Sequence, residues 1–426
     1  AKHLARKLKN KSGVNITLID RNTFHFFTPL LHEVATGGIE ANHIKRPLRP
    51  LFRDTVVEIE RGNVQKINLK KKEVTICASC PTCSNRELCS IKFNLEAEGM
   101  ASCRKKTFSY DYLVIAMGSA PNFFGIEGAA EHAFVLNSID SAERIKEHIV
   151  SCFELADHID DYEVRKSFLN FVIVGAGATG IEFGVELHDL CIENLTPDFE
   201  RVDFPRDGRI MVVEALDKIL PMMDEQLTEY ARKLVQERHI EIMTNTKITR
   251  VGMKEVEING NEIIPAHTVV WSAGVKANEV IAGVKAAKDR LGRLMVNRSL
   301  QLEDYPEVFA LGDNACFMEE EKPLPQTAQV AVQQAKCLAD NIESLVKGQP
   351  LEPFKFVNFG SIISLGPNKG IANFMGPVKF SGFLAWLSWK SIYLRHLLIL
   401  EPPHKALWIW LVDLVSNREI SRHKVH

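Results

Sequence analysis

The chain has 426 residues, more than one hydrophobic core usually holds, so two or three domains are expected. Its net charge of -2, with 25% charged residues, excludes an electrostatic case for nucleic acid as the main partner. Of its nine cysteines, five lie between residues 77 and 103, which is not the pattern of a secreted disulfide scaffold and indicates a reducing compartment.

The first segment has the pattern of half a nucleotide-binding unit. AKHLARKLKNKSG is an amphipathic helix with Leu4 and Leu8 on one face, and the strand VNITLID ends in Asp20. A helix followed by a strand that ends in an acid is the second half of a dinucleotide-binding βαβ unit, in which the acid meets the ribose. We therefore expect the first strand and its Gly-rich turn to lie upstream of residue 1, and this chain alone to hold that nucleotide poorly.

A cysteine-rich insert interrupts the first domain. Cys77, Cys80, Cys83 and Cys89 follow the spacing C-x2-C-x2-C-x5-C, which supplies enough thiolates for a tetrahedral zinc site. An iron-sulfur cluster is an alternative, although its usual run has a shorter last gap. Free thiols or a redox-sensing disulfide, with Cys103 as the fifth sulfur, also stay open.

The segment FVIVGAGATGIEFGVEL contains Gly175, Gly177 and Gly180 in G-x-G-x-x-G spacing, between an apolar strand and a helix. That context predicts a turn that places a pyrophosphate at the helix N-terminus. Glu214 ends the next strand, where an acid accepts hydrogen bonds from the adenosine ribose diol and repels a 2'-phosphate. The prediction is NAD rather than NADP, the alternative being a solvated glutamate at a strand end.

A later buried strand, FALGDNA, ends in Gly312 and Asp313. Asp313 is predicted to face the ribityl chain of a flavin, although an acid there could instead cap the following helix. The late position of this strand predicts an α/β fold with two Rossmann-like dinucleotide-binding domains, one inserted in the other. The predicted division is 1–122 (interrupted by the insert 77–103), 123–290, 291–375 and a helical tail at 376–426.

The tail contains four of the five tryptophans and carries seven Lys/Arg against three acids from residue 379 onward. Its two apolar stretches are too short to span a bilayer. They are predicted to lie in the lipid interface, with Lys390, Arg395 and Lys405 attracting anionic lipid, and to be dispensable for reaction with a soluble acceptor. The alternative is a pair of core or dimer-interface helices, the latter in a homodimer.

Together these segments resemble the membrane-associated type II NADH:quinone oxidoreductases, a family within the two-dinucleotide-binding-domain flavoproteins. The resemblance rests on ITLIDRNTFHFFTPLLHEVATGG, YDYLVIAMGS, VIVGAGATGIEFGVEL, VVWSAGV, VFALGDNA, TAQVAVQQA and VKFSGFLAWLSW. It implies FAD in the first domain, NADH in the second and quinone approaching from the membrane. The FAD contacts it implies are Asp20, Arg21, Val64, Ala116, Gly118, Gly312, Asp313 and Ala328. Those implied along NADH are Gly175, Gly177, Gly180, Glu182, Glu214, Ala273 and Gly274.

AQVAVQQ matches the family's AQ-x-x-x-Q signature, which implies that Gln329, Gln333 and Gln334 line the flavin and quinone pocket. Glu182 and Gln333 are expected near the reacting face, and Lys379 is expected to stabilise reduced flavin or quinone. The implied location is peripheral, on the cytoplasmic face of the cell membrane or on the inner mitochondrial membrane. Sulfide:quinone oxidoreductase is the nearest rival and needs cysteines facing the flavin. The other alternative is a non-catalytic redox sensor that docks on a membrane.

Overall fold

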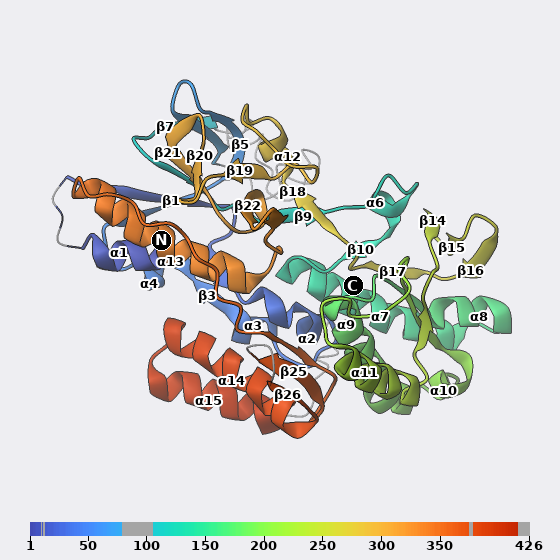
Figure 1. Ribbon diagram of the computed structural model, residues 1–426. Helices are drawn as coiled ribbons and strands as arrows, with labels where there is room; N and C mark the ends of the chain where they lie inside the picture. Colours follow the sequence, from blue (N-terminus) through green and yellow to red (C-terminus); the bar gives the residue numbers. More distant parts are fainter. Residues whose placement is uncertain (10, 12, 79–104, 375–377, 416–426) are drawn as a thin grey trace, which may run out of the picture. The chain divides into compact units, whose positions relative to one another are not determined.

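A computed structural model describes residues 1–9, 11, 13–78, 105–374 and 378–415 (Figure 1). The chain divides into two compact units, each built from separate stretches of sequence. The first unit contains residues 1–25, 46–120 and 275–358. The second contains residues 26–45, 121–274 and 359–426.

In the second unit a five-stranded parallel sheet has the order β10-β17-β11-β12-β13. The strands are β10 (Phe134–Val135), β17 (Thr268–Trp271), β11 (Asn170–Val174), β12 (Arg209–Val213) and β13 (Glu241–Met243). Every residue of β11 and β17 is buried, as expected of parallel strands with both faces covered. The helices that pack on this sheet include α7 (Ile139–His158), α8 (Tyr162–Leu169), α9 (Ala178–Asp189) and α11 (Glu225–Glu237).

An antiparallel sheet of β14 (Ile248–Val251), β15 (Glu255–Ile258) and β16 (Glu262–Pro265) also belongs to this unit. Its inward side chains share a core with those of β17, since Val256 and Ile258 cluster with Val269 and Trp271. The short elements of the unit are η1 (Thr28–Leu30), α2 (Leu31–Ala35), α3 (Ala41–Ile44), α6 (Ala129–His132), η2 (Leu190–Leu195), η3 (Thr196–Asp198) and α10 (Phe204–Asp207).

The first unit brings distant parts of the sequence into one sheet. β8 (Leu113–Ile115) pairs in parallel with β21 (Tyr305–Ala310), which also pairs with β20 (Gln301–Leu302). Because β8 and β21 run in the same direction, the segments that follow them meet at one edge of the sheet. β21, which lies about 190 residues after β8 in the sequence, thus belongs to the same sheet as β8.

The remaining strands of this unit form small sheets. They are β1 (Ile16–Asp20) with β4 (Val57–Arg61), then β5 (Asn63–Asn68), β6 (Glu73–Cys77) and β7 (Lys105–Ser109), then β19 (Leu294–Val296), β22 (Ala315–Glu319) and β23 (Lys322–Pro323). The helices are α1 (Lys2–Lys7), α4 (Leu48–Leu51), α12 (Glu279–Ala282), α13 (Ala328–Val346) and the turn η4 (Gly312–Asn314). β18 (Val275–Ala277) also belongs to this unit. The strands β2 (Phe24–Phe26), β3 (Lys45–Pro47) and β9 (Ser119–Pro121) span the points in the sequence where one unit ends and the other begins.

Helix α1 is amphipathic, as its sequence predicts: Ala5 and Leu8 are buried while most of its other side chains are exposed or partly exposed. It packs on α13, where the ammonium of Lys7 contacts Asp340 at 2.7 Å and Glu343 at 2.8 Å. These two carboxylates raise the pKa of Lys7, chiefly through the hydrogen bond that its ammonium donates to Asp340.

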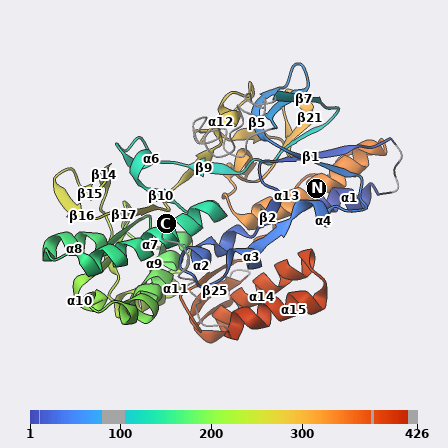
Figure 2. The same ribbon diagram turned by 180° about the vertical axis from the view of Figure 1, so that it is seen from behind.

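The end of the chain completes the second unit. β24 (Ser361–Ser364), β25 (Gly370–Phe374) and β26 (Val378–Ser381) form an antiparallel sheet against which α14 (Phe383–Leu400) packs. Helix α15 (Pro403–Val415) returns alongside α14, and the two lie side by side in both views (Figure 2). Among the described residues, no helix is both long enough and apolar enough to cross a membrane.

Helix α14 has apolar side chains on both of its sides. Ala385, Trp389, Tyr393 and Leu397 repeat every four residues and are buried. Phe383, Leu384, Ile392 and Leu398 of the same helix are exposed. One stripe therefore belongs to the core of the second unit, while the other faces outward.

Candidate dinucleotide and redox site

The Gly-rich turn connects β11 to α9 at the carboxyl edge of the parallel sheet. Gly175 has a φ of +102°, and a Cβ built there would lie 2.9 Å from the backbone of Ala273. A Cβ at Gly180 would overlap the carbonyl oxygen of Gly175, whereas one at Gly177 would meet nothing within 4 Å. The first and third glycines thus allow close backbone packing, and the second leaves open space in front of the helix N-terminus.

Glu214 lies directly beside this turn, although a long connection separates the two in sequence. Its Oε2 accepts a hydrogen bond from the Ala176 N–H at 2.8 Å, and its Oε1 accepts one from the Leu216 N–H at 2.9 Å. Each carboxylate oxygen has a further lone pair for a ribose hydroxyl. The carboxylate at the end of β12 therefore fits an adenosine ribose whose pyrophosphate lies on α9.

The end of β17 forms the third side of this site. Ser272 donates from its hydroxyl to the carbonyl oxygens of Val174 and Gly175, at 2.9 and 3.1 Å. Gly274 follows with a φ of +68°, in the left-handed region that favours glycine. The predicted NADH residues Ala273 and Gly274 thus stand next to the Gly-rich turn, as neighbouring parallel strands require.

The first unit assembles a second set of predicted residues at the ends of β8 and β21. The Ser119 hydroxyl donates to Asp313 Oδ2 at 2.7 Å, which joins the two strand ends. Gly118 and Gly312 have φ values of +68° and +66°, and a Cβ at Gly118 would meet nothing within 4 Å. This open, acid-bearing edge fits the hydroxyl-rich ribityl chain predicted for it.

The other predicted flavin contacts occupy separate positions in this unit. Asp20 ends β1, where burial raises the pKa of its carboxyl and its Oδ1 accepts a hydrogen bond from the Asn22 N–H at 2.8 Å. Val64 lies in β5 and packs against the core of the unit. Arg21, Ala116 and Ala328 are exposed, so their side chains are accessible to a ligand.

The glutamines of α13 have different surroundings. Gln334 is buried, and its Oε1 accepts a hydrogen bond from the Gly312 N–H at 2.7 Å. Gln333 exchanges two hydrogen bonds with the backbone of Val357, at 2.8 and 3.0 Å, and Gln329 is half-buried. In this structure Gln334 positions the turn that carries Asp313, and Gln333 holds the segment after α13.

Glu182 belongs to a buried cluster of charged residues in the second unit. Its Oε1 accepts a hydrogen bond from the Ser364 N–H at 3.1 Å, and its Oε2 lies 4.0 Å from His32 Nδ1. Burial raises the pKa of Glu182 to about 8, and the nearby carboxylates of Glu33 and Glu186 contribute to that rise. At neutral pH this carboxyl therefore holds its proton.

Sequence reasoning missed the neighbours of Glu182. Glu33 on α2 forms an ion pair with Lys390 on α14, at 3.1 Å between Oε2 and Nζ. The prediction that Lys390 faces anionic lipid is wrong, because its side chain is only 11% exposed. A charged pair, His32-Glu33, inside an otherwise apolar stretch, and a lone lysine inside an apolar helix, were the signals that could have found this contact.

The interfacial-helix prediction also needs correction for the tryptophans. Trp389 is buried, and Trp410 donates from its indole nitrogen to the Lys390 carbonyl at 2.7 Å, whereas Trp408 is 69% exposed. A tail that supplies so many buried contacts is not a dispensable appendage. Deleting the chain from Phe380 onward is therefore expected to destabilise the second unit as well as to weaken contact with lipid.

Lys379 on β26 contacts an acid instead of open space. Its Nζ lies 2.6 Å from Asp224 Oδ2, and this hydrogen bond lowers the pKa of the Asp224 carboxyl. Asp224 also caps α11 by accepting from the Gln226 N–H. The predicted role of Lys379 toward flavin or quinone stays a prediction.

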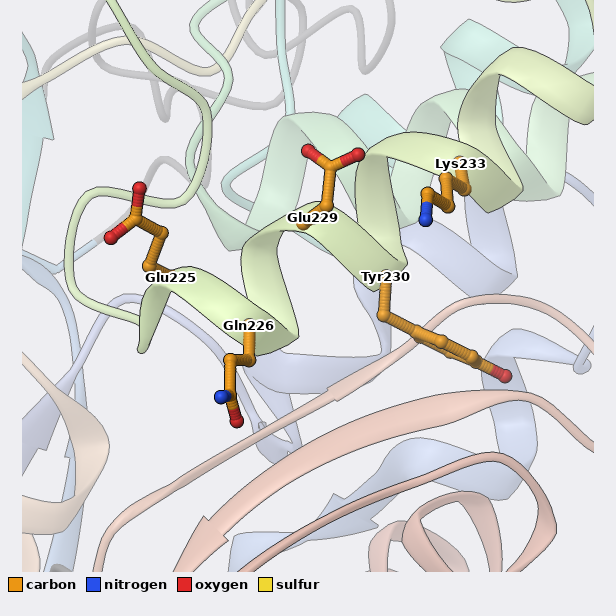
Figure 3. A pocket seen from close by; sticks show the side chains of 5 residues that line it. All are labelled: Glu225, Gln226, Glu229, Tyr230 and Lys233. Carbon is orange, nitrogen blue, oxygen red and sulfur yellow. The ribbon is translucent and has the colours of Figure 1, made fainter.

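A solvent-facing hollow of about 490 Å³ lies on α11 next to this ion pair. Figure 3 shows its lining, with Glu229 pointing to the side of the helix opposite Gln226 and Tyr230. The full lining is Glu225, Gln226, Glu229, Tyr230 and Lys233, and it includes none of the predicted site residues.

The cysteines fall into two groups. Cys77 ends β6 with a buried side chain and is disulfide-bonded, so a four-thiolate zinc site would require this bond to be reduced. Cys80, Cys83, Cys89 and Cys103 lie outside the described residues, and zinc there stays a prediction. Among the described residues no cluster of metal-binding side chains is found. Burial raises the pKa of the Cys152 thiol to about 11, and Cys191 and Cys316 are buried as well.

Comparison with known proteins identifies the family of the chain. Residues 1–335 match the family described as pyridine nucleotide-disulphide oxidoreductase. The chain is similar to the type II NADH:quinone oxidoreductase Ndh of Mycobacterium tuberculosis, with 32% identity covering 97% of this chain and 86% of the relative. A probable NADH dehydrogenase of Dictyostelium discoideum is 32% identical, covering 97% and 88%. The fold matches NDH2 from Plasmodium falciparum, solved in complex with NADH, with a TM-score of 0.82, 18% identity, and 97% and 95% covered.

Proposed function

Because the chain belongs to the pyridine nucleotide-disulphide oxidoreductases and to the type II NADH:quinone oxidoreductases, we propose that it oxidises NADH and reduces a membrane quinone, with FAD as its resident cofactor. The reaction consumes NADH, one proton and a quinone, and it releases NAD⁺ and a quinol. The proposed reaction is non-electrogenic, which means that it moves no proton across the membrane. The observation that carries the proposal is the placement of Glu214 beside the Gly-rich turn.

The second unit supplies the NADH site in this proposal, as a Rossmann-like domain inserted in the flavin domain. The pyrophosphate lies at the N-terminus of α9 in front of Gly177, where the unsatisfied N–H groups and the helix dipole favour an anion. Glu214 accepts the ribose hydroxyls, and its charge disfavours a 2'-phosphate. The backbone of Ala273 and Gly274 borders the remainder of the dinucleotide.

The first unit supplies the FAD site, as a discontinuous Rossmann-like domain. The residues that would hold it are Asp20, Arg21, Val64, Ala116, Gly118, Gly312, Asp313 and Ala328. When bound, FAD supplies the two-electron chemistry that links the donor to the acceptor. The residues of the chain bind and orient it: Asp313 is fixed by Ser119, and Gln334 fixes the turn at Gly312.

Quinone reduction needs a proton beyond the hydrogen that NADH carries, and Glu182 is the proposed group that holds it. The raised pKa of this carboxyl supports the proposal, because the group is protonated when the reaction starts at neutral pH. From the family resemblance, Gln333 is proposed to lie near the flavin, and Lys379 is proposed to stabilise reduced flavin or quinone.

We further propose that α14 and α15 hold the protein peripherally on a membrane, the cytoplasmic face of the cell membrane in a bacterium or the inner mitochondrial membrane in a eukaryote. The exposed apolar side chains of the two helices support this: Phe383, Leu384, Ile392, Leu398, Leu407, Trp408 and Leu411. Exposed apolar side chains grouped on neighbouring helices are typical of an interaction surface. A homodimer contact through the same helices stays the alternative.

The test is anaerobic titration of the FAD-loaded full-length protein, followed at the flavin absorbance, first with NADH and then with a quinone. Rapid bleaching by NADH and recovery with quinone are expected. Bleaching by sulfide but not NADH would favour a sulfide:quinone oxidoreductase, although the thiols of Cys152, Cys191 and Cys316 are buried and so do not fit sulfide chemistry. Absence of bleaching by either donor would favour a redox sensor.

A further inference from the structure

A buried ion pair joins the C-terminal helix α14 to α2 within the second unit. Lys390 Nζ lies 3.1 and 3.3 Å from the two carboxylate oxygens of Glu33. The side chains of Lys390 and Glu33 are 11% and 7% exposed. An ion pair so far from water is a costly arrangement, and apolar side chains of similar volume often stabilise a fold equally well. We therefore ask what the buried positive charge of Lys390 does to the neighbouring carboxyls.

The surroundings of this pair are acidic. Glu186 on α9 lies close to Glu33, since a Cβ built at Gly38 would be 3.6 Å from both Glu186 Oε2 and Glu33 Cβ. The carboxylates of Glu33 and Glu186 also help to raise the pKa of Glu182, so the three carboxyls form one group. The other groups toward Glu182 are His32 on α2, 4.0 Å away, and the Ser364 N–H from β24. The next acid along α9, Asp189, has its own partner in Arg238 at 3.3 Å. Lys390 thus places a positive charge beside this group, in contact with Glu33.

Lys390 is held where it can do this. Its helix turn is fixed by the hydrogen bond from Trp410 on α15 to the Lys390 carbonyl at 2.7 Å. The neighbouring Trp389 and Tyr393 are buried in the core of the unit. The packing of the α14–α15 pair therefore decides where this ammonium group lies.

We propose that Lys390, through its ion pair with Glu33, is a positioning residue that sets the net charge of the buried carboxyl cluster and so determines whether Glu182 carries a proton at neutral pH. The catalytic consequence of this role rests on the proposed function, in which Glu182 holds the proton for quinone reduction. It assigns the C-terminal helices a second role besides membrane contact: they supply the charge that adjusts the proton-holding group.

The signs of the expected effects differ between the two members of the pair. Glu33→Gln removes a negative charge and leaves Lys390 in place, so the cluster releases its proton at lower pH. Lys390→Met removes a positive charge and leaves Glu33 in place, so the proton is released at higher pH. A charge within about 4 to 6 Å of a carboxyl shifts its titration midpoint by about one pH unit or more. The double variant keeps the net charge of the pair at zero and should return close to wild type.

The experiment measures the infrared carbonyl stretch of protonated carboxyls against pH in the FAD-loaded full-length protein without substrate. Glu182→Gln assigns the band. Lys254→Met, which removes an exposed lysine from the turn between β14 and β15, is the matched control and should shift nothing. Opposite shifts in the two single variants, cancelled in the double variant, are expected; shifts of one sign, or no cancellation, would overturn the proposal. If Lys390→Met does not fold, Glu33→Gln and the double variant still decide the question.

The pH profile of quinone turnover gives the second measurement. In each variant, the pH at which quinone turnover is half-maximal should shift in the same direction as the pH midpoint of the infrared band. If Glu182→Gln leaves quinone turnover unchanged, the catalytic role of Glu182 fails, while the infrared shifts still test the charge coupling. A purely structural pair would change stability in both single variants without shifting the two midpoints in opposite directions.

Discussion

Two properties of this molecule are proposed to depend on single carboxylates, and the first is the choice of dinucleotide, which we assign to Glu214. Replacing Glu214 with alanine removes the acceptor for the ribose diol and the charge that repels a 2'-phosphate. Hydrogen bonds to a charged group contribute about 1.5 to 3 kcal/mol each, so kcat/KM for NADH should fall by at least tenfold and the preference over NADPH should narrow. Steady-state kinetics with both dinucleotides check this. An unchanged ratio would show that Glu214 does not read the ribose.

Glu182 affects stability in a pH-dependent way that follows from its raised pKa. In the unfolded chain this carboxyl ionises near its usual pKa, whereas in the folded protein it keeps its proton up to about pH 8. Between those values the folded state binds the extra proton, so the contribution of this group to stability falls as pH rises and then levels off.

Glu182→Gln removes that titration. The variant and the wild type should therefore have similar Tm values near pH 5, and the variant should have the higher Tm at pH 8. Thermal unfolding across this range measures the difference. A constant difference in Tm at all pH values would contradict the raised pKa.

At the scale of elements, α13 offers a comparison of two adjacent glutamines given the same substitution. Gln334→Leu leaves the partly buried Gly312 N–H without its acceptor, which should cost about 1 to 3 kcal/mol of unfolding free energy. Gln333→Leu loses hydrogen bonds that are solvent-exposed and should cost clearly less. Denaturant unfolding of both variants, with FAD content measured alongside, makes the comparison. Equal losses would mean that the buried position of Gln334 has no special weight.

The sequence predicted those elements whose local pattern has only one structural solution. The glycines at 175, 177 and 180 between an apolar strand and a helix left little choice, and the acid at the end of β12 followed from the strand pattern. It could not predict the partner of Lys390. An apolar helix with one lysine fits a lipid surface as well as a core, and only the fold brings α2, about 357 residues earlier in the chain, to that lysine.

The same limit applies to α13. A spacing of four residues places Gln329 and Gln333 on one face of a helix, but it does not reveal that Gln333 contacts the segment around Val357. Such contacts depend on how the chain returns after the helix ends, which no local pattern encodes.

At the scale of the whole molecule, the C-terminal helices carry two kinds of apolar side chain, and only the exposed kind is available to lipid. Replacing Leu384, Trp408 and Leu411 with serine tests this, because these side chains are exposed and the buried side chains of α14 stay unchanged. Burying a large apolar side chain is worth about 1.5 to 3 kcal/mol, so the triple variant should bind vesicles at least a hundredfold more weakly. Vesicle cosedimentation measures the binding.

Turnover in the same vesicles then separates membrane binding from folding. Reduction of a long-tailed quinone should fall steeply in the triple variant, whereas NADH oxidation by a soluble acceptor should stay within about twofold, because the substituted side chains face away from the core and a substitution at such a site rarely costs much stability. Met253→Ser, at a 71% exposed position on the hairpin of β14 and β15, is the control and should change neither activity. Equal loss with both acceptors would mean that these side chains pack in a dimer or in the fold, and no loss with either would remove the membrane role from this surface.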